Sequence, residues 1–210
     1  MDMIELLITV GREIAQSGLA QGSGGNLSYR DGNTIHITAS GAKLDALTTD
    51  DFVAVTTEGQ TASRRKPSSE LLMHLAAYAA LPGAQVVLHA HPPKAIALGA
   101  LGRDLPALTP DFYLHLGPRV PLVPYLTPTT PELAEALQNT MANHRAVLLQ
   151  NHGVVVAGAD PASALLRLQL LEEAAGIWLS ALPVGEPRAL TPDDYRALDE
   201  ATGGRYRINS

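Results

Sequence analysis

Three histidines are the residues of this chain whose types and spacing indicate metal chemistry. His89 and His91 belong to the triplet His89-Ala90-His91, and His152 follows much later, in Gln150-Asn151-His152-Gly153. Catalytic zinc sites usually have three protein ligands and one open position, whereas structural zinc sites close their shell with four. The sequence therefore indicates a metal site that keeps a coordination position open.

The elements around these histidines are of the kind that would position them. A short run with strand propensity, residues 85–88, leads into His89. On a strand, residues i and i+2 point to the same face, so His89 and His91 can converge on one ion while Ala90 faces away. A second strand-like run, 147–150, delivers His152 at its end. A single histidine is more often structural, so the prediction depends on all three together.

The composition is that of an ordinary globular protein, since 46% of the 210 residues are hydrophobic and 17% are charged. The formal net charge of −6 argues against broad binding to nucleic acid or anionic membranes. The chain has no cysteine, which excludes disulfides and agrees with a cytoplasmic location. No apolar run approaches the roughly 18 residues of a membrane span, and we find no signal-peptide pattern at the N-terminus. We therefore expect a cytoplasmic protein.

Helices and short strands alternate along the chain. We read them as one α/β domain over residues 1–210, with a short C-terminal tail from about residue 183. The expected helices cover 3–14, 68–80, 92–98, 131–141 and 160–182, and a last short helix begins near 191. The expected strands cover 27–30, 34–38, 52–56, 85–89, 120–125, 146–150 and 154–157. Because several strands are joined by short turns, the sheet should be mixed or antiparallel.

Three further segments could together bind an anion. The glycine-rich loop 22–26 can expose backbone N–H groups, but it lies between a helix and a strand, the reverse of the Rossmann and P-loop order. Residues 38–41 offer hydroxyl groups at a strand end. Residues 67–70 open a helix, with Ser68 or Ser69 as its N-cap, and helix N-termini favour anions. Each segment alone is explained by a turn or a cap, whereas the three together predict a phosphate pocket.

Glu70 lies at the start of that predicted helix. A carboxylate in the first turn is favoured by the helix dipole, which is a sufficient explanation by itself. The functional alternative is a general acid/base beside the metal.

Taken in order, these segments resemble the class II aldolase/adducin family from about residue 3 to 182. The resemblance rests on Gly24-Gly25-Asn26-Leu27-Ser28-Tyr29-Arg30, Thr38-Ala39-Ser40-Gly41, Pro67-Ser68-Ser69-Glu70, His89-Ala90-His91 and Asn151-His152-Gly153. It implies a single α/β domain with a central, mainly antiparallel sheet flanked by helices. It also implies a homotetramer with active sites at the subunit interfaces.

The resemblance assigns roles to the residues that match these motifs. His89, His91 and His152 match the ligands of a catalytic Zn²⁺, although manganese or cobalt would accept the same imidazoles. Glu70 matches the acidic residue that binds the metal at rest and serves as acid/base. The residues that match the phosphate-binding segments are Gly25, Asn26, Ser40, Gly41, Ser68 and Ser69. The remaining histidines, His36, His74, His115 and His144, are predicted to have no role in the site.

The implied reaction is the cleavage of a phosphorylated ketose to dihydroxyacetone phosphate and an aldehyde, through an enediolate that the metal stabilises. Such a lyase would serve carbohydrate metabolism, for example pentose catabolism. The alternatives are a 3-oxo-tetronate 4-phosphate decarboxylase, an epimerase or a dehydratase, and Thr109-Pro110 and Pro121-Leu122-Val123-Pro124-Tyr125 resemble the decarboxylases. A non-enzymatic, adducin-like binding module is disfavoured because all three histidines and Glu70 are retained.

The sequence departs from the family's aldolases at a tyrosine that a neighbouring subunit donates. Pro110 falls at the expected position, and we predict that Tyr113, three residues later, replaces this tyrosine. The alternative is that Tyr113 is an interface or core aromatic. Tyr206, in the tail, resembles a C-terminal tyrosine that the aldolases use.

Overall fold

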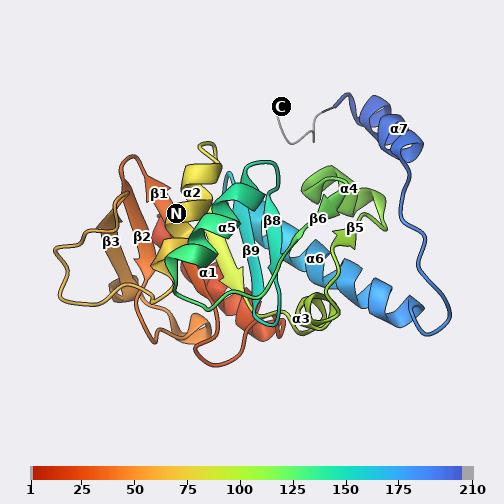
Figure 1. Cartoon of the computed structure of the whole chain (residues 1–210). Helices are drawn as coiled ribbons and strands as arrows, with labels where there is room; N and C mark the ends of the chain where they lie inside the picture. Colours follow the sequence, from red (N-terminus) through yellow and green to blue (C-terminus); the bar gives the residue numbers. More distant parts are fainter. Residues whose placement is uncertain (1, 205–210) are drawn as a thin grey trace.

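A seven-stranded sheet forms the centre of the molecule, and helices cover both of its faces (Figure 1). The structure is a computed structural model that describes residues 2–204. The strands of this sheet are β1 (Asn26–Asp31), β2 (Thr34–Thr38), β3 (Phe52–Thr56), β4 (Val86–Ala90), β7 (Leu122–Val123), β8 (Ala146–Leu149) and β9 (Gly153–Gly158). Their order is β3-β2-β1-β4-β9-β8-β7, and each neighbouring pair is antiparallel except β7 and β8. The prediction of a mainly antiparallel sheet is confirmed.

The helices divide between the two faces of the sheet. They are α1 (Met3–Gln16), α2 (Leu71–Ala80), α3 (Pro93–Ala100), α4 (Pro110–Leu116), α5 (Pro131–Met141), α6 (Pro161–Ala181) and α7 (Pro192–Thr202). Helices α1, α3, α4 and α6 share one hydrophobic core with the sheet, and α2 and α5 share the other. A separate ribbon of β5 (Leu105–Pro106) and β6 (Arg119–Val120) lies beside α4 (Figure 1).

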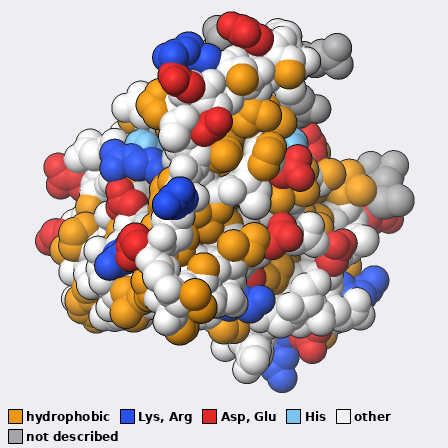
Figure 2. Space-filling view, turned by 90° about the vertical axis from the view of Figure 1, so that its right-hand side faces the viewer, with side chains coloured by type: hydrophobic (Ala, Val, Ile, Leu, Met, Phe, Trp, Pro, Cys, Tyr) orange, Lys and Arg blue, Asp and Glu red, His pale blue; other side chains and the backbone are white. Residues whose placement is uncertain are grey.

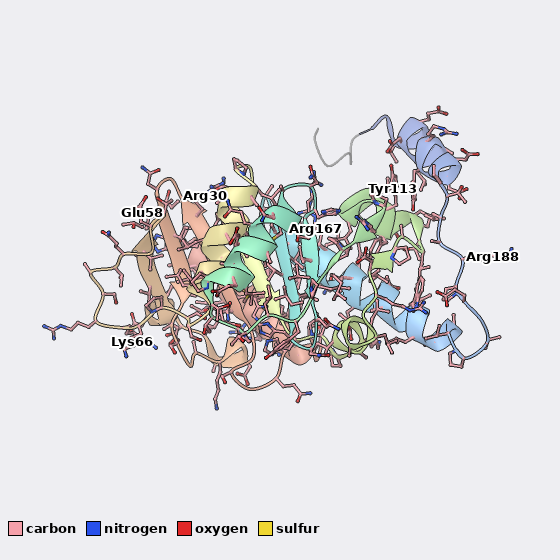
Figure 3. The ribbon with its side chains drawn as sticks, viewed as in Figure 1. Arg30, Glu58, Lys66, Tyr113, Arg167 and Arg188 are labelled. Carbon is pink, nitrogen blue, oxygen red and sulfur yellow. The ribbon has the colours of Figure 1, made fainter. Side chains whose placement is uncertain are left out.

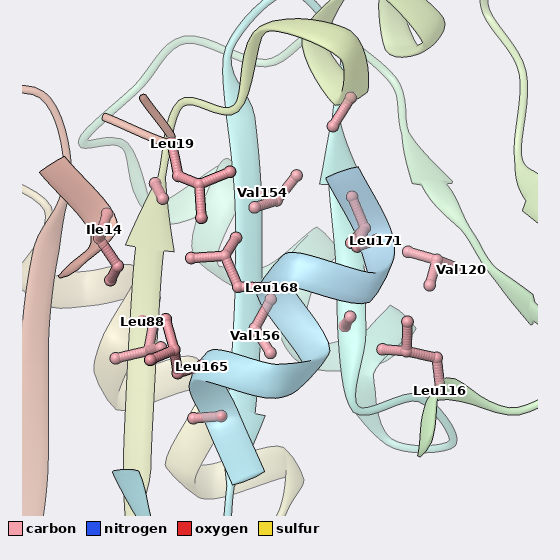
Figure 4. Packing of buried hydrophobic residues seen from close by; sticks show 14 of the residues in the cluster. Ile14, Leu19, Leu88, Leu116, Val120, Val154, Val156, Leu165, Leu168 and Leu171 are labelled. Carbon is pink, nitrogen blue, oxygen red and sulfur yellow. The ribbon is translucent and has the colours of Figure 1, made fainter. Parts of the chain in front are cut away.

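The two cores exist because the central strands are buried on both faces. On β4, Leu88 and Ala90 belong to the core under α6, whereas Val87 belongs to the core under α2 and α5. Figure 4 shows Leu165 and Leu168 of α6 packed over this part of the sheet. Successive side chains of a strand alternate between its faces, so His89 shares the face of Val87 and points toward α2.

Two helices differ from the sequence prediction. Helix α2 begins at Leu71, so the predictions that it begins at residue 68 and that Ser68 or Ser69 caps it are wrong. The N-cap residue is Glu70, whose backbone N–H donates to Ser68 Oγ at 3.2 Å, so the serine closes a turn before the helix. Helix α4 was not predicted, although Thr109 caps it and Pro110 opens it in the usual way. Its seven residues are too few to show a helical repeat.

Among residues 2–204, none of the helices combines the length and the apolar character that a membrane span requires. Figure 2 shows the side of the molecule that lies at the right of Figure 1, where hydrophobic side chains reach the surface among acidic and basic ones. Tyr206 lies outside the described residues.

Candidate metal centre and phosphate pocket

The three predicted histidines lie together at one end of the sheet. His89 belongs to β4, His91 follows the strand, and His152 lies in the turn between β8 and β9. One potential ligand atom from each residue lies within 4.8 Å of the others. The Nε2 atoms of His89 and His91 are 2.9 Å apart. Pairing of β4 with β9 therefore brings His152 to the pair, although it is distant in the sequence.

The β8–β9 turn fits closely against the histidines because position 153 is a glycine. A methyl group at this position would lie 2.4 Å from the carbonyl oxygen of Ala90 and 2.7 Å from His91 Cδ2. Asn151, before His152, adopts a left-handed conformation with φ of 55°, which asparagine tolerates better than most residues. These two residues let the turn place His152 directly beside β4.

The glycine-rich loop supports the same strand from the other side. Asn26, the first residue of β1, pairs with His89. Gly25 has a φ of +88°, and a Cβ there would lie 2.7 Å from the carbonyl oxygen of His89. Only glycine combines this conformation with so close an approach. The loop is thus explained by packing against β4, the strand that carries His89, whether or not it also binds an anion.

Glu70 links the histidines to β1. Its Oε2 lies 3.2 Å from His89 Nε2 and its Oε1 lies 3.1 Å from His152 Nε2. The side-chain amide of Asn26 donates to Oε2 at 2.8 Å. Burial raises the pKa of Glu70, but the hydrogen bonds from His152 and His89, the charge of His89 and the Asn26 amide outweigh it and hold the pKa far below its usual value. Glu70 is therefore ionised in this arrangement.

The donor set fits a divalent metal ion. Nδ1 of His89 lies 2.9 Å from the carbonyl oxygen of Val154 and can donate a hydrogen bond to it. When a metal replaces the Nε2 proton that faces Glu70, the Nε2 lone pair is available as a ligand. Burial, together with the charges of His89 and His152, lowers the pKa of His91 to about 4, so this ring is neutral near pH 7, as a ligand must be. Three imidazoles beside a carboxylate make a site that could bind a metal, with zinc as the usual occupant of such sets.

A small polar pocket adjoins Glu70. Its volume is about 160 Å³. The residues predicted to bind phosphate all line it: Gly25, Asn26, Ser40, Gly41, Ser68 and Ser69. Glu70 lines it as well, so one carboxylate borders both the histidines and the pocket. The N-terminus of α2 begins directly after Glu70, and the dipole of this helix favours an anion there.

Tyr113 lies apart from the three histidines in the structure. Its ring stacks on Tyr195 of α7, with centroids 4.3 Å apart, and its hydroxyl donates to Asp199 at 3.3 Å. In Figure 3 this contact is at the upper right, whereas α3, which starts just after His91, lies at the lower edge of the sheet in Figure 1. The structure does not bring Tyr113 to the histidines of its own chain, so its catalytic role stays a prediction that requires a second subunit.

His74 is a residue of the site that the sequence reasoning missed. Its Nε2 lies 2.5 Å from Asn26 Oδ1, so it contacts the residue that holds Glu70. The available signal was its spacing, because His74 is four residues after Glu70 and residues i and i+4 share a helix face. The other three histidines without a predicted role, His36, His115 and His144, have no described contact with Glu70.

The comparison with family models shows the family to which a chain with this site belongs. The model of the class II aldolase and adducin N-terminal domain matches residues 5–179, which include every residue of the site. The chain belongs to the class II aldolase and adducin family. Within this family, the chain is similar in structure to an L-fuculose 1-phosphate aldolase, with a TM-score of 0.90, 31% sequence identity and coverage of 96% of both chains.

Curated members of the family are similar over nearly the whole chain. A 5-deoxy-D-ribulose 1-phosphate aldolase of Bacillus thuringiensis is 34% identical and covers 92% of both sequences. A 3-oxo-tetronate 4-phosphate decarboxylase of Haemophilus influenzae is 32% identical, over 93% of this chain and 95% of its own length. Aldolases and decarboxylases both cleave a carbon–carbon bond, so the comparisons support an enzyme of the lyase class.

Proposed function

We propose that this protein is a zinc-dependent aldehyde-lyase that cleaves a phosphorylated ketose to dihydroxyacetone phosphate and an aldehyde. The observation that carries the proposal is the position of Glu70, between two histidine ligands and at the edge of the phosphate pocket. In this place it borders both the proposed metal and the pocket proposed for the phosphate. A bound zinc would supply a Lewis acid for the substrate carbonyl.

Glu70 can act as a base once it leaves the histidines. Its hydrogen bonds to His89 and His152 keep the pKa low, while burial raises it. When a substrate displaces the carboxylate from the histidines, the hydrogen bonds that lower the pKa of Glu70 are lost. Burial, which raises this pKa, then has the larger effect, and the pKa rises. A carboxylate oxygen of Glu70 can then hold the proton that moves during cleavage.

The phosphate pocket would orient the other end of the substrate. The hydroxyls of Ser40, Ser68 and Ser69 and the backbone of Gly25 and Gly41 offer donors to a phosphate. Contacts to the phosphate, away from the bond that breaks, would hold the substrate so that its reacting carbons are correctly placed. The amide of Asn26 is engaged by Glu70 and His74, so Asn26 contributes mainly by holding the carboxylate.

A decarboxylase is the second candidate, because a 3-oxo-tetronate 4-phosphate decarboxylase is similar over nearly its whole length. Loss of CO₂ would use the same metal ligands and phosphate pocket, but the released product would be CO₂ and not an aldehyde. We favour the aldolase because the first curated relative and the structural neighbour above are both aldolases.

An activity screen tests this proposal. Purified zinc-loaded protein is mixed with L-fuculose 1-phosphate, 5-deoxy-D-ribulose 1-phosphate and 3-oxo-tetronate 4-phosphate, and both aldehyde and CO₂ are measured. Aldehyde release supports the aldolase, and CO₂ release alone replaces it with the decarboxylase. No turnover of any of them, or protein without a stoichiometric divalent metal, overturns the proposal.

Two variants test the residue roles. His91→Ala should lose both bound zinc and turnover, whereas His36→Ala, half-buried against Tyr29 on β2 and outside the site, should keep both. Glu70→Gln should keep the metal and lose proton transfer. A zinc-replete, active His91→Ala protein or a wild-type rate in Glu70→Gln would remove the residue from its role.

We propose further that the protein is a cytoplasmic homotetramer in which Tyr113 of one subunit reaches the site of another. The exposed apolar side chains include Leu101, Ile177 and Val184, which contact between subunits would cover. Light scattering of the purified protein measures the assembly. A Tyr113→Phe variant with wild-type turnover would remove the tyrosine from the mechanism.

A further inference from the structure

A buried chain of hydrogen bonds lies behind Glu70. Tyr78 OH is 2.9 Å from Ser28 Oγ, and Ser28 Oγ is 2.7 Å from His74 Nδ1. His74 Nε2 is 2.5 Å from Asn26 Oδ1, and Asn26 Nδ2 donates to Glu70 at 2.8 Å. Ser28, His74 and Tyr78 are at most 3% exposed. These bonds thus link Tyr78, near the C-terminal end of α2, to the carboxylate through buried side chains.

The direction of these hydrogen bonds follows from the orientation of the Asn26 amide. Its NH₂ group donates to Glu70 Oε2, and its carbonyl oxygen faces His74. That oxygen requires a donor, so the proton of His74 is on Nε2. Nδ1 is then an acceptor, and the Ser28 hydroxyl donates a hydrogen bond to it. Tyr78 can in turn donate to Ser28 at 2.9 Å, which is nearer than its other acceptor, the carbonyl oxygen of Gln85 at 3.4 Å.

The opposite tautomer of His74 would break this arrangement. With the proton on Nδ1, Nε2 would face Asn26 Oδ1 as a second acceptor, and the amide would turn over to relieve the repulsion. Its oxygen would then face the carboxylate of Glu70. A hydrogen bond of the charged group would be replaced by a repulsion in a buried place, where unsatisfied groups are most costly.

The surroundings of His74 favour a neutral ring with one fixed tautomer. Burial and the charge of His89 lower the pKa of His74 to about 3, against a smaller opposing effect of Glu70. The ring is therefore neutral over the range in which an enzyme works, and only the position of its single proton is left to determine. The carbonyl oxygen of Asn26 places this proton on Nε2, and the Ser28 hydroxyl can donate to the Nδ1 that is left unprotonated.

We propose that His74 is a positioning residue: its Nε2–H, supported by the Ser28 and Tyr78 hydroxyls on the Nδ1 side, orients the Asn26 amide that holds Glu70 in its reactive orientation. The proposal rests on the proposed function, in that Glu70 is taken to be the acid/base. It assigns to three buried residues a role in the reaction, although none of them would touch the substrate.

The tautomer itself is the first test, and it needs no activity. In ¹⁵N-labelled full-length protein at pH 8, His74 should show a protonated Nε2 and an unprotonated Nδ1. The side-chain amide protons of Asn26 should show the slow exchange of a group bonded to a carboxylate. A protonated Nδ1 in His74 would overturn the proposal, even if the protein proves to be an aldolase.

Two substitutions of similar size separate positioning from packing. His74→Met fills the space but cannot donate to Asn26, so kcat should fall roughly tenfold, which corresponds to one lost hydrogen bond to a polar group. His74→Gln offers an N–H near the place of Nε2, so it should recover most of this loss. The rate is measured on the phosphorylated substrate that is turned over fastest in the screen above. His144→Met, in the turn after α5 and outside the site, is the control and should keep the wild-type rate.

Substitutions of Ser28 and Tyr78 test the direction of the hydrogen bonds in this series. Ser28→Ala should allow both tautomers, visible in the ¹⁵N spectrum, and lower kcat by a few-fold, whereas Tyr78→Phe, one bond further away, should have a smaller effect. Equal losses in folded His74→Met and His74→Gln would show that only shape matters and would overturn the proposal. If His74→Met does not fold, the spectra of wild type and Ser28→Ala still decide it. If no substrate is turned over, the proposed function fails, while the tautomer and the Asn26 exchange remain measurable.

Discussion

Substitution of Gly153 tests whether the β8–β9 turn holds the metal centre together. In Gly153→Ala the new methyl group would lie 2.4 Å from the Ala90 carbonyl oxygen and 3.2 Å from His89 Cε1. The nearest atom is backbone, so β9 and β4 must separate by at least about 0.6 Å to reach even a tight contact, and such overpacking costs about 1–3 kcal/mol. The same movement shifts His152 away from the other two ligands. We therefore expect a loss of zinc affinity of about 10–100-fold, the range seen when the support of a ligand is removed.

Two measurements on the same protein check this prediction. Urea unfolding of the metal-free variant gives the loss of stability, and competition with a chelator gives the zinc affinity. Gly83→Ala is the matched control, because a methyl group there meets no atom within 4 Å. It should be neutral or slightly stabilising, through the reduced entropy of the unfolded chain. A Gly153→Ala protein with the unfolding midpoint and zinc affinity of the wild type would refute the reasoning.

Three further predictions concern stability. Because the pKa of His74 is about 3 when folded and about 6.5 when unfolded, the unfolded chain binds one more proton between these values. The free energy of unfolding should then be highest above pH 6.5 and fall by about 1.4 kcal/mol per pH unit on acidification toward pH 3; urea titrations at several pH values should show a shallower slope in His74→Gln. Asp160 caps α6 by accepting from the N–H of Ser163, so Asp160→Ala should lower the urea stability by about 1 kcal/mol, and an unchanged midpoint would contradict the cap. Arg167, labelled in Figure 3, donates to the carbonyl oxygens of His115 and Ala157, so Arg167→Met should cost about 1–3 kcal/mol by leaving buried acceptors unpaired, while zinc affinity stays unchanged.

The local elements were readable because each depends on neighbouring residues. The turn residues Asp31-Gly32-Asn33 predicted the hairpin of β1 and β2, and Asp160-Pro161 predicted the start of α6. The short turns between strands predicted a mixed or antiparallel sheet, and the family resemblance implied a mainly antiparallel one. The start of α2 was misplaced because Ser68 is as good a cap as any serine, and only the turn formed with Glu70 shows that the helix begins later.

The sequence by itself determined which residue types were available for the site and in what order: the three histidines, Glu70 and the serine and glycine segments. What the tertiary structure decided was their distances. His152 reaches His89 only through the pairing of β4 and β9, and Glu70 reaches both only because α2 covers the face of the sheet toward which His89 points. The link from His74 through Asn26 to Glu70 joins a helix to a strand, and no local pattern encodes such a contact. Spacing along a chain determines which side chains share a face, whereas contacts between elements depend on how the whole core packs.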